Sequence, residues 1–63
     1  MNYMTREEIE CISNLLNALL NDILEMNFTK NKINYLAETL IANKGFKTTA
    51  YTINYYMNEY LFG

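Results

Sequence analysis

The apolar residues between positions 9 and 26 follow one another at alternating intervals of three and four residues, and this spacing constrains the fold most strongly. They are Ile9, Ile12, Leu16, Leu19, Ile23 and Met26. Such a stripe predicts a helix that buries one face. Because the chain has no proline and its two glycines are Gly45 and Gly63, nothing in this stretch should interrupt the helix.

Short polar residues mark where this first helix should begin and end. Thr5 and Glu8 have the spacing of a capping box, in which each side chain bonds the backbone of the other residue. Asn27 tolerates the left-handed conformation in which many helices end. We therefore expect the first helix over about residues 5–26.

Thr29 and Gly45 delimit the second helix and determine where the third can start. Thr29 can cap a second helix over about residues 29–44, and Gly45 can end it as a left-handed cap residue. The link before Thr29 is only about three residues, so the first two helices should be antiparallel. The third helix should then cover about residues 48–62.

These spacings predict an all-α domain of three helices over residues 1–63, with the first helix as the long central element. So small a domain is marginal without further support. One cysteine, Cys11, and no histidine leave neither an internal disulfide nor a zinc site. Tight helix packing, self-association or both should stabilise the domain. The expected core consists of Ile12, Leu16, Leu19, Ile23, Leu36, Leu40, Ile53, Tyr56 and Tyr60.

The first helix carries more apolar surface than a helix packed on one side needs. Cys11 and Leu15 widen its stripe on one side, and Leu20 and Leu24 widen it on the other. Water should meet only a narrow polar stripe made of Glu10, Asn14, Asn17, Asn21 and Glu25. We therefore expect this helix to pack on two sides, with Cys11 as a structural thiol.

Four tyrosines within ten positions give the third helix a second apolar face. Helical spacing turns Tyr56 and Tyr60 toward the core and places the other two on the opposite side. One further tyrosine lies outside the apolar face of the second helix. The outward residues expected to contact a partner are Tyr35, Tyr51, Tyr55 and Phe62.

Residues that carry catalysis are almost absent. The chain has no histidine, Asp22 is its only aspartate, and no glycine-rich loop could hold a phosphate. Glu7, Glu8 and Glu10 fit the positive end of a helix dipole better than a metal site. The sequence therefore predicts a non-enzymatic protein with no cofactor, no metal and no small-molecule substrate.

Charge and hydropathy indicate where such a protein would reside. The net charge is −2 and 51% of the residues are hydrophobic, which is too apolar for a disordered tail. The first ten residues lack the basic segment and apolar run of a signal peptide. No uninterrupted apolar stretch reaches the roughly 18 residues of a membrane span. We therefore expect a cytoplasmic protein with no membrane partner.

Exposed aromatic side chains on a small domain are typical of an interaction surface, because tyrosine supplies large contact area at low entropic cost. Lys44 and Lys47 could form a charged rim around such a surface. The sequence thus predicts a protein-binding module that acts as an inhibitor, adaptor or regulator. We also expect it to associate with itself as a homodimer.

The alternative function is nucleic-acid binding through the second helix, the turn NKGFK and the third helix. Residues 28–47 hold four lysines against one acidic residue, a net charge of +3. Tyrosines beside lysines could also stack single-stranded bases. The residues that would contact nucleic acid, or form the charged rim, are Lys30, Lys32, Lys44, Lys47 and Asn54.

The run GFKTTAYTINYY resembles the second helix-turn-helix of AraC-type regulators, and the resemblance implies DNA binding. It covers 12 residues and rests on Gly45, Phe46, Tyr51 and Tyr56. Those motifs carry an alanine where Ile41 stands here and a basic residue where Asn54 stands. Two of the motif's positions are therefore not matched by this chain.

Overall fold

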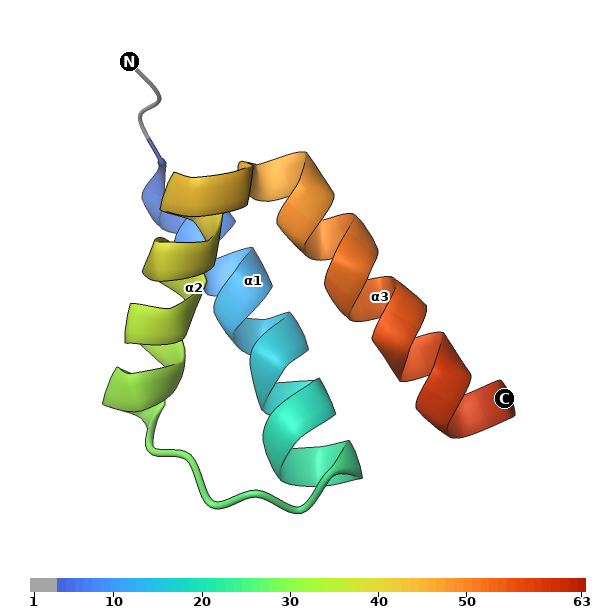
Figure 1. Ribbon diagram of the computed structural model, residues 1–63. Coiled ribbons are helices and arrows are strands. Elements are labelled where there is room, and N and C mark those ends of the chain that lie inside the picture. Colours follow the sequence, from blue (N-terminus) through green and yellow to red (C-terminus); the bar gives the residue numbers. More distant parts are fainter. Residues whose placement is uncertain (1–3) are drawn as a thin grey trace.

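The protein folds into three helices, and the part of the chain from residue 4 to residue 63 contains no strand (Figure 1). The computed structural model describes residues 4–63, so residues 1–3 of the expected domain lie outside the described part. The elements are α1 (Arg6–Leu16), continued by a π-helical segment η1 (Asn17–Ile23), then α2 (Lys30–Lys44) and α3 (Phe46–Phe62). The predicted all-α, three-helix fold is confirmed.

The capping residues behave as predicted at the start of the first two helices. The Glu8 backbone N–H donates to the Thr5 hydroxyl at 3.1 Å, and the Thr5 N–H donates to the Glu8 carboxylate at 3.0 Å. At the start of α2, the Lys32 N–H donates to the Thr29 hydroxyl at 3.2 Å. Each bond satisfies a backbone donor that the helix itself leaves unpaired.

The first helix changes its hydrogen-bond pattern at Asn17. Leu16 and Asn17 keep right-handed helical dihedral angles, so the helix continues, but the Leu24 N–H donates to the Leu19 carbonyl, five residues back. A π-turn holds one residue more than an α-turn. As a result Leu24 packs against the core, whereas Ile23 is half-buried and lies outside the core cluster. The prediction of Ile23 as a core residue is therefore wrong.

The first helix ends at Ile23, and the left-handed residue that follows it is Glu25 and not Asn27. Glu25 has a φ of 55°, the only positive φ of a non-glycine residue among residues 4–63. The Met26 N–H then donates to the Leu20 carbonyl at 2.8 Å, which closes the widened helix end. The prediction of a left-handed Asn27 is wrong because an asparagine only tolerates this conformation and does not impose it.

Gly45 alone connects α2 to α3. Its φ of 85° and ψ of 160° lie in a region that is essentially restricted to glycine, and its N–H donates to the Ile41 carbonyl at 2.8 Å. The helix α3 therefore begins at Phe46, two residues earlier than expected. Thr49 is not at a helix start but is 2% exposed, and its hydroxyl donates to the Leu40 carbonyl.

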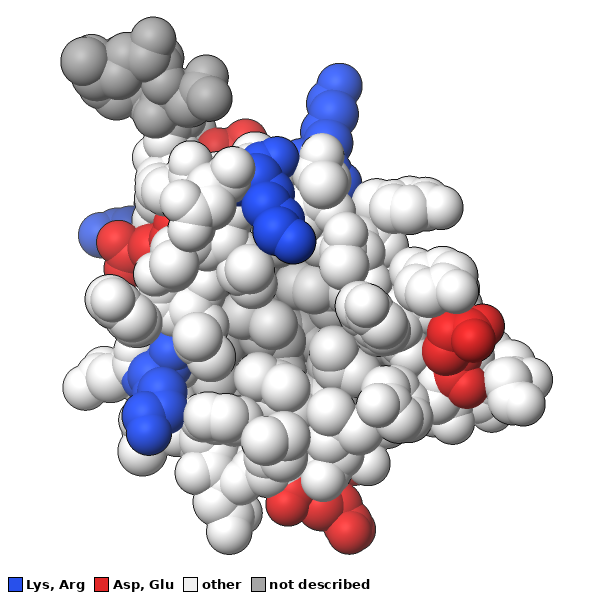
Figure 2. All heavy atoms as spheres, viewed as in Figure 1, with Lys and Arg blue, Asp and Glu red and all other residues white. Residues whose placement is uncertain are grey.

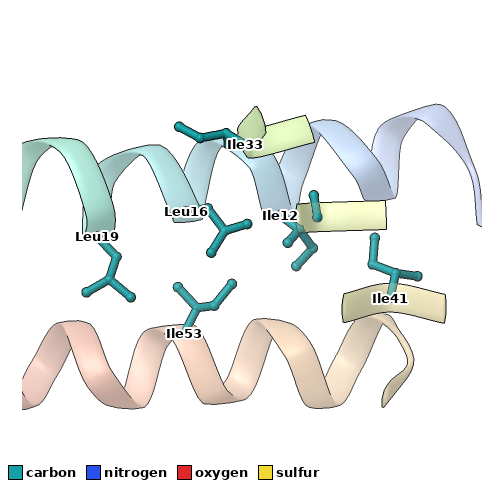
Figure 3. Close-up of a cluster of buried hydrophobic side chains, with 7 residues drawn as sticks. Ile12, Leu16, Leu19, Ile33, Ile41 and Ile53 are labelled. Atoms are coloured by element: carbon teal, nitrogen blue, oxygen red, sulfur yellow. The ribbon is translucent and has the colours of Figure 1, made fainter. Parts of the chain in front are cut away.

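The core lies between α1, α2 and α3 and consists of aliphatic side chains (Figure 3). Both α2 and α3 pack on α1, as predicted, and they also contact each other. The predicted core residues Leu36 and Leu40 are half-buried and pack against the edge of the core. The buried hydrophobic residues are Ile12, Leu16, Leu19, Ile33, Ala37, Ile41 and Ile53.

Tyr56 and Tyr60 do not enter the core, and their prediction as core residues is wrong. They are 50% and 60% exposed. Ile53 is the last buried residue of α3 and Met57 the last half-buried one, so the remainder of α3 extends past the core. The end of α3 lies away from α1 in Figure 1. Helical spacing specifies the side of a helix but not whether another element covers it.

Two polar or weakly polar residues of the first helix also differ from expectation. Cys11 is exposed, so it is not a thiol packed within the apolar face. Asn21, expected in the solvent-facing stripe, is half-buried and bonds the segment that precedes α2. The apolar arc of the helix is therefore narrower at Cys11 than the sequence suggested.

Candidate functional site

The largest group of exposed apolar side chains lies on α3. We call this group the α3 aromatic surface. Phe62 is 83% exposed and Tyr51 73%, and each other member has at least half of its side chain exposed. It consists of Tyr51, Tyr55, Tyr56, Tyr60, Leu61 and Phe62.

Tyr55 and Tyr56 contact each other within this surface, although they lie on different sides of α3. Their rings pack edge to face, with centroids 5.5 Å apart and ring planes at 73°. Such an arrangement is favoured by the charge distribution of aromatic rings. Tyr55 was expected on the outward side and Tyr56 on the inward side, so this contact connects one residue of each predicted side.

Charged groups are scarce on this part of the chain. Glu59 is the only charged residue from position 48 to position 63. Viewed as in Figure 1, the centre of the molecular face is uncharged, one basic side chain lies across its upper part, and an acidic side chain lies over the far part of α3 (Figure 2). Depletion of charge around aromatic residues is characteristic of the centre of protein interfaces.

The predicted partner contacts are all exposed, but they lie on two different helices. Tyr51, Tyr55 and Phe62 belong to α3, and Tyr35, 69% exposed, belongs to α2. In Figure 1, α1 and η1 lie between α2 and α3 except near Gly45, where α2 and α3 meet. The structure therefore groups three of the four residues on one element and leaves Tyr35 on another.

The four lysines of the second and third helices are divided between the two ends of α2. Lys30 and Lys32 lie in its first turn, where the Lys32 Nζ is 5.7 Å from the centre of the Phe28 ring. Lys44 and Lys47 flank Gly45 at the other end, about 20 Å away along the helix. The lysines therefore do not form one continuous basic patch.

The connection between α2 and α3 also differs from a helix-turn-helix. Gly45 is the single linking residue, whereas such motifs use a turn of about three to four residues. The turn NKGFK is thus mostly helical, with Lys44 ending α2 and Phe46 beginning α3. Asn54 is exposed on α3. No feature of this corner adds to the resemblance to AraC-type regulators.

A second candidate site, missed by sequence reasoning, lies in the groove between α1 and α2. It is an open pocket of about 380 Å³. Ser13 is 9% exposed, and its hydroxyl has no hydrogen-bond partner. A signal was present in the sequence, since this serine interrupts the apolar positions of the first helix. The pocket is lined by Arg6, Ile9, Glu10, Ser13, Lys30 and Asn34.

Two kinds of site are not found in the part of the protein that the structure describes. No group of three or more His, Cys, Asp or Glu side chains there could hold a metal ion. None of the helices described is long and apolar enough to cross a membrane.

Comparisons with known proteins return no relative of this chain. No protein-family model, no curated protein and no solved structure matches it.

Proposed function

We propose that this protein is a non-enzymatic binding module whose α3 aromatic surface docks onto another protein chain, including a second copy of itself. One observation carries the proposal. Six large apolar side chains on a single helix have at least half of their surface exposed. Solvent contact of this extent is unfavourable, and burial against a partner relieves it.

The area of the surface supports this proposal. A large aromatic side chain buries about 150–250 Å² when it is fully covered. From the exposed fractions, the six residues together offer on the order of 700 Å². One side of a standard protein interface buries about 800 Å². Because Tyr51, Tyr55 and Phe62 lie on the opposite side of α3 from Tyr56 and Tyr60, a partner must wrap around the end of the helix to bury an area close to that of a standard interface.

Self-association follows from the same surface because it projects from one end of α3. Residues 58–63 are all exposed, so the last turns of the helix are accessible from several directions. Two copies could pack these turns against one another and bury Tyr60, Leu61 and Phe62 on both sides, with the exposed Glu59 at the edge of the contact. As an inhibitor, adaptor or regulator in the cytoplasm, the protein would act by occupying a partner's surface, with Lys47 at the rim.

Photo-crosslinking tests the proposed surface. A photoreactive phenylalanine analogue replaces Tyr51 in one variant and Tyr35 in a matched variant, since the two tyrosines have similar exposure on different helices. The purified full chain is then irradiated and its products are separated by mass. We expect products joining two chains from position 51 and few from position 35. Equal yields from both positions would contradict the assignment to α3.

A further inference from the structure

The groove between α1 and α2 has the size and shape of a small ligand site. Its volume of about 380 Å³ lies within the range of about 300–1,000 Å³ that ligand pockets occupy. The residues from α1 occupy positions i, i+3, i+4 and i+7, which share one face of that helix, and Lys30 and Asn34 share one face of α2. The two helices therefore present their side chains to one common space.

Ser13 is the observation that points to a ligand. Its hydroxyl is buried and has no hydrogen-bond partner, whereas the large majority of buried polar atoms in proteins have one. Ser13 lines the groove. Less than 1 Å² of its oxygen is exposed, so its side chain must turn about χ1 before the hydroxyl can donate a hydrogen bond to an acceptor held there. Asn34 can offer amide N–H groups to the same space.

The charges around the groove favour one negative charge. Arg6 and Lys30 are cationic and Glu10 is anionic, which gives the lining a net charge of +1 in a chain whose net charge is −2. The planar guanidinium of Arg6 matches a carboxylate, to which it can donate two parallel hydrogen bonds. Glu10 would oppose a second negative charge, as on phosphate. Ile9 supplies apolar surface beside these groups.

We propose that the groove between α1 and α2 binds a single carboxylate group carried on a short aliphatic chain. Arg6 and Lys30 hold its charge, Ser13 and Asn34 donate hydrogen bonds to its oxygens, and Ile9 contacts its carbon atoms. The site is independent of the α3 aromatic surface. Such a carboxylate could belong to a small free acid or to the C-terminus of a peptide.

The first experiment uses the isotope-labelled full chain and follows its amide NMR signals at constant ionic strength. Butyrate is the ligand probe and butyramide, of equal size but neutral, is its control. We expect saturable shifts at Ile9, Ser13 and Asn34 with butyrate and at least about tenfold weaker binding of butyramide, as for loss of a charge-assisted contact. Equal responses to the two compounds, or no response to butyrate, would overturn the proposal.

Four substitutions make the test specific. Ser13→Ala and Lys30→Gln should each weaken butyrate binding by about tenfold, because each removes a donor to the carboxylate. Lys47→Gln makes the same charge change outside the groove and should leave binding unchanged. Glu10→Gln should strengthen binding. Circular dichroism verifies that each variant is folded, and Ser13→Ala removes only an unpaired hydroxyl. If Ser13→Ala and Lys30→Gln both bind butyrate as tightly as the wild type, the proposed binding site is wrong.

A further binding experiment with peptides identifies the kind of molecule that supplies the carboxylate. A short peptide with a free C-terminus is compared with its C-terminally amidated form. Tighter binding of the free peptide than of butyrate assigns the groove to the end of a partner chain. Binding of butyrate without binding of the peptide assigns it to a small free acid.

Discussion

The side chain of Asn21 forms hydrogen bonds with both backbone polar groups of Phe28. Its Nδ2 donates to the Phe28 carbonyl and its Oδ1 accepts from the Phe28 N–H, both at 3.1 Å. The same Nδ2 also donates to the Asn17 side chain one turn earlier. One side chain from η1 thus satisfies the main chain just before α2 and holds the two elements in register.

Replacing Asn21 should destabilise the fold more than replacing any asparagine of the exposed stripe. Asn21→Ala leaves the half-buried Phe28 carbonyl without its Asn21 donor, whereas the Phe28 N–H keeps its bond to the Met26 carbonyl, so we expect a cost of about 1 kcal/mol. Asn14→Ala, on an exposed residue of α1, should change stability by less than about 0.5 kcal/mol. Urea unfolding at equal protein concentration measures both, since self-association would make stability depend on concentration. Equal urea midpoints for Asn21→Ala and Asn14→Ala would show that the hydrogen bonds between Asn21 and Phe28 do not stabilise the fold.

The helix starts were predictable because capping is local chemistry. Thr5 with Glu8, and Thr29 alone, form the bonds that their spacing implies. The π-helical segment was not predictable in this way. Its cause is tertiary, since it places Leu24 against the core and Asn21 against Phe28, and no residue type marks such a change of register.

The hydroxyl of Thr49 should stabilise the corner between α2 and α3. It is buried and donates to the Leu40 carbonyl at 3.2 Å. Thr49→Val keeps the shape and removes the hydrogen bond, so we expect a loss of about 1 kcal/mol in unfolding free energy. Thr48→Val provides the control, because Thr48 is exposed. If thermal or urea denaturation ranks the two variants together, the Thr49 bond is not stabilising.

Gly45 should tolerate no other residue without strain. A Cβ atom at this position would meet nothing within 4 Å. A loss of stability on substitution would therefore come from the backbone, whose φ of 85° is unfavourable for residues with a side chain. We expect Gly45→Ala to destabilise the protein by about 1–3 kcal/mol and to reduce the melting temperature. A variant as stable as the wild type would mean that α2 and α3 can be joined through another conformation.

The sequence located the exposed aromatic residues of α3 but underestimated their number. Tyr51, Tyr55 and Phe62 were identified because they lie opposite Ile53 on the helix. Tyr56 and Tyr60 lie on the same side as Ile53, and only the position of α1 in space reveals that nothing covers them. The groove at Ser13 was missed for a similar reason, because it depends on which residues of α2 lie beside α1.

Sedimentation equilibrium of the full chain over a wide concentration range tests the binding role of the α3 aromatic surface most directly. We predict that the average mass of the wild type rises above that of one chain as concentration increases. The double variant Tyr51→Ala, Tyr55→Ala should dissociate at concentrations at least about tenfold higher, while Tyr35→Ala behaves as the wild type and all three show equal helicity. A wild type that stays a single chain throughout, or a double variant that associates as tightly as the wild type, would contradict this account.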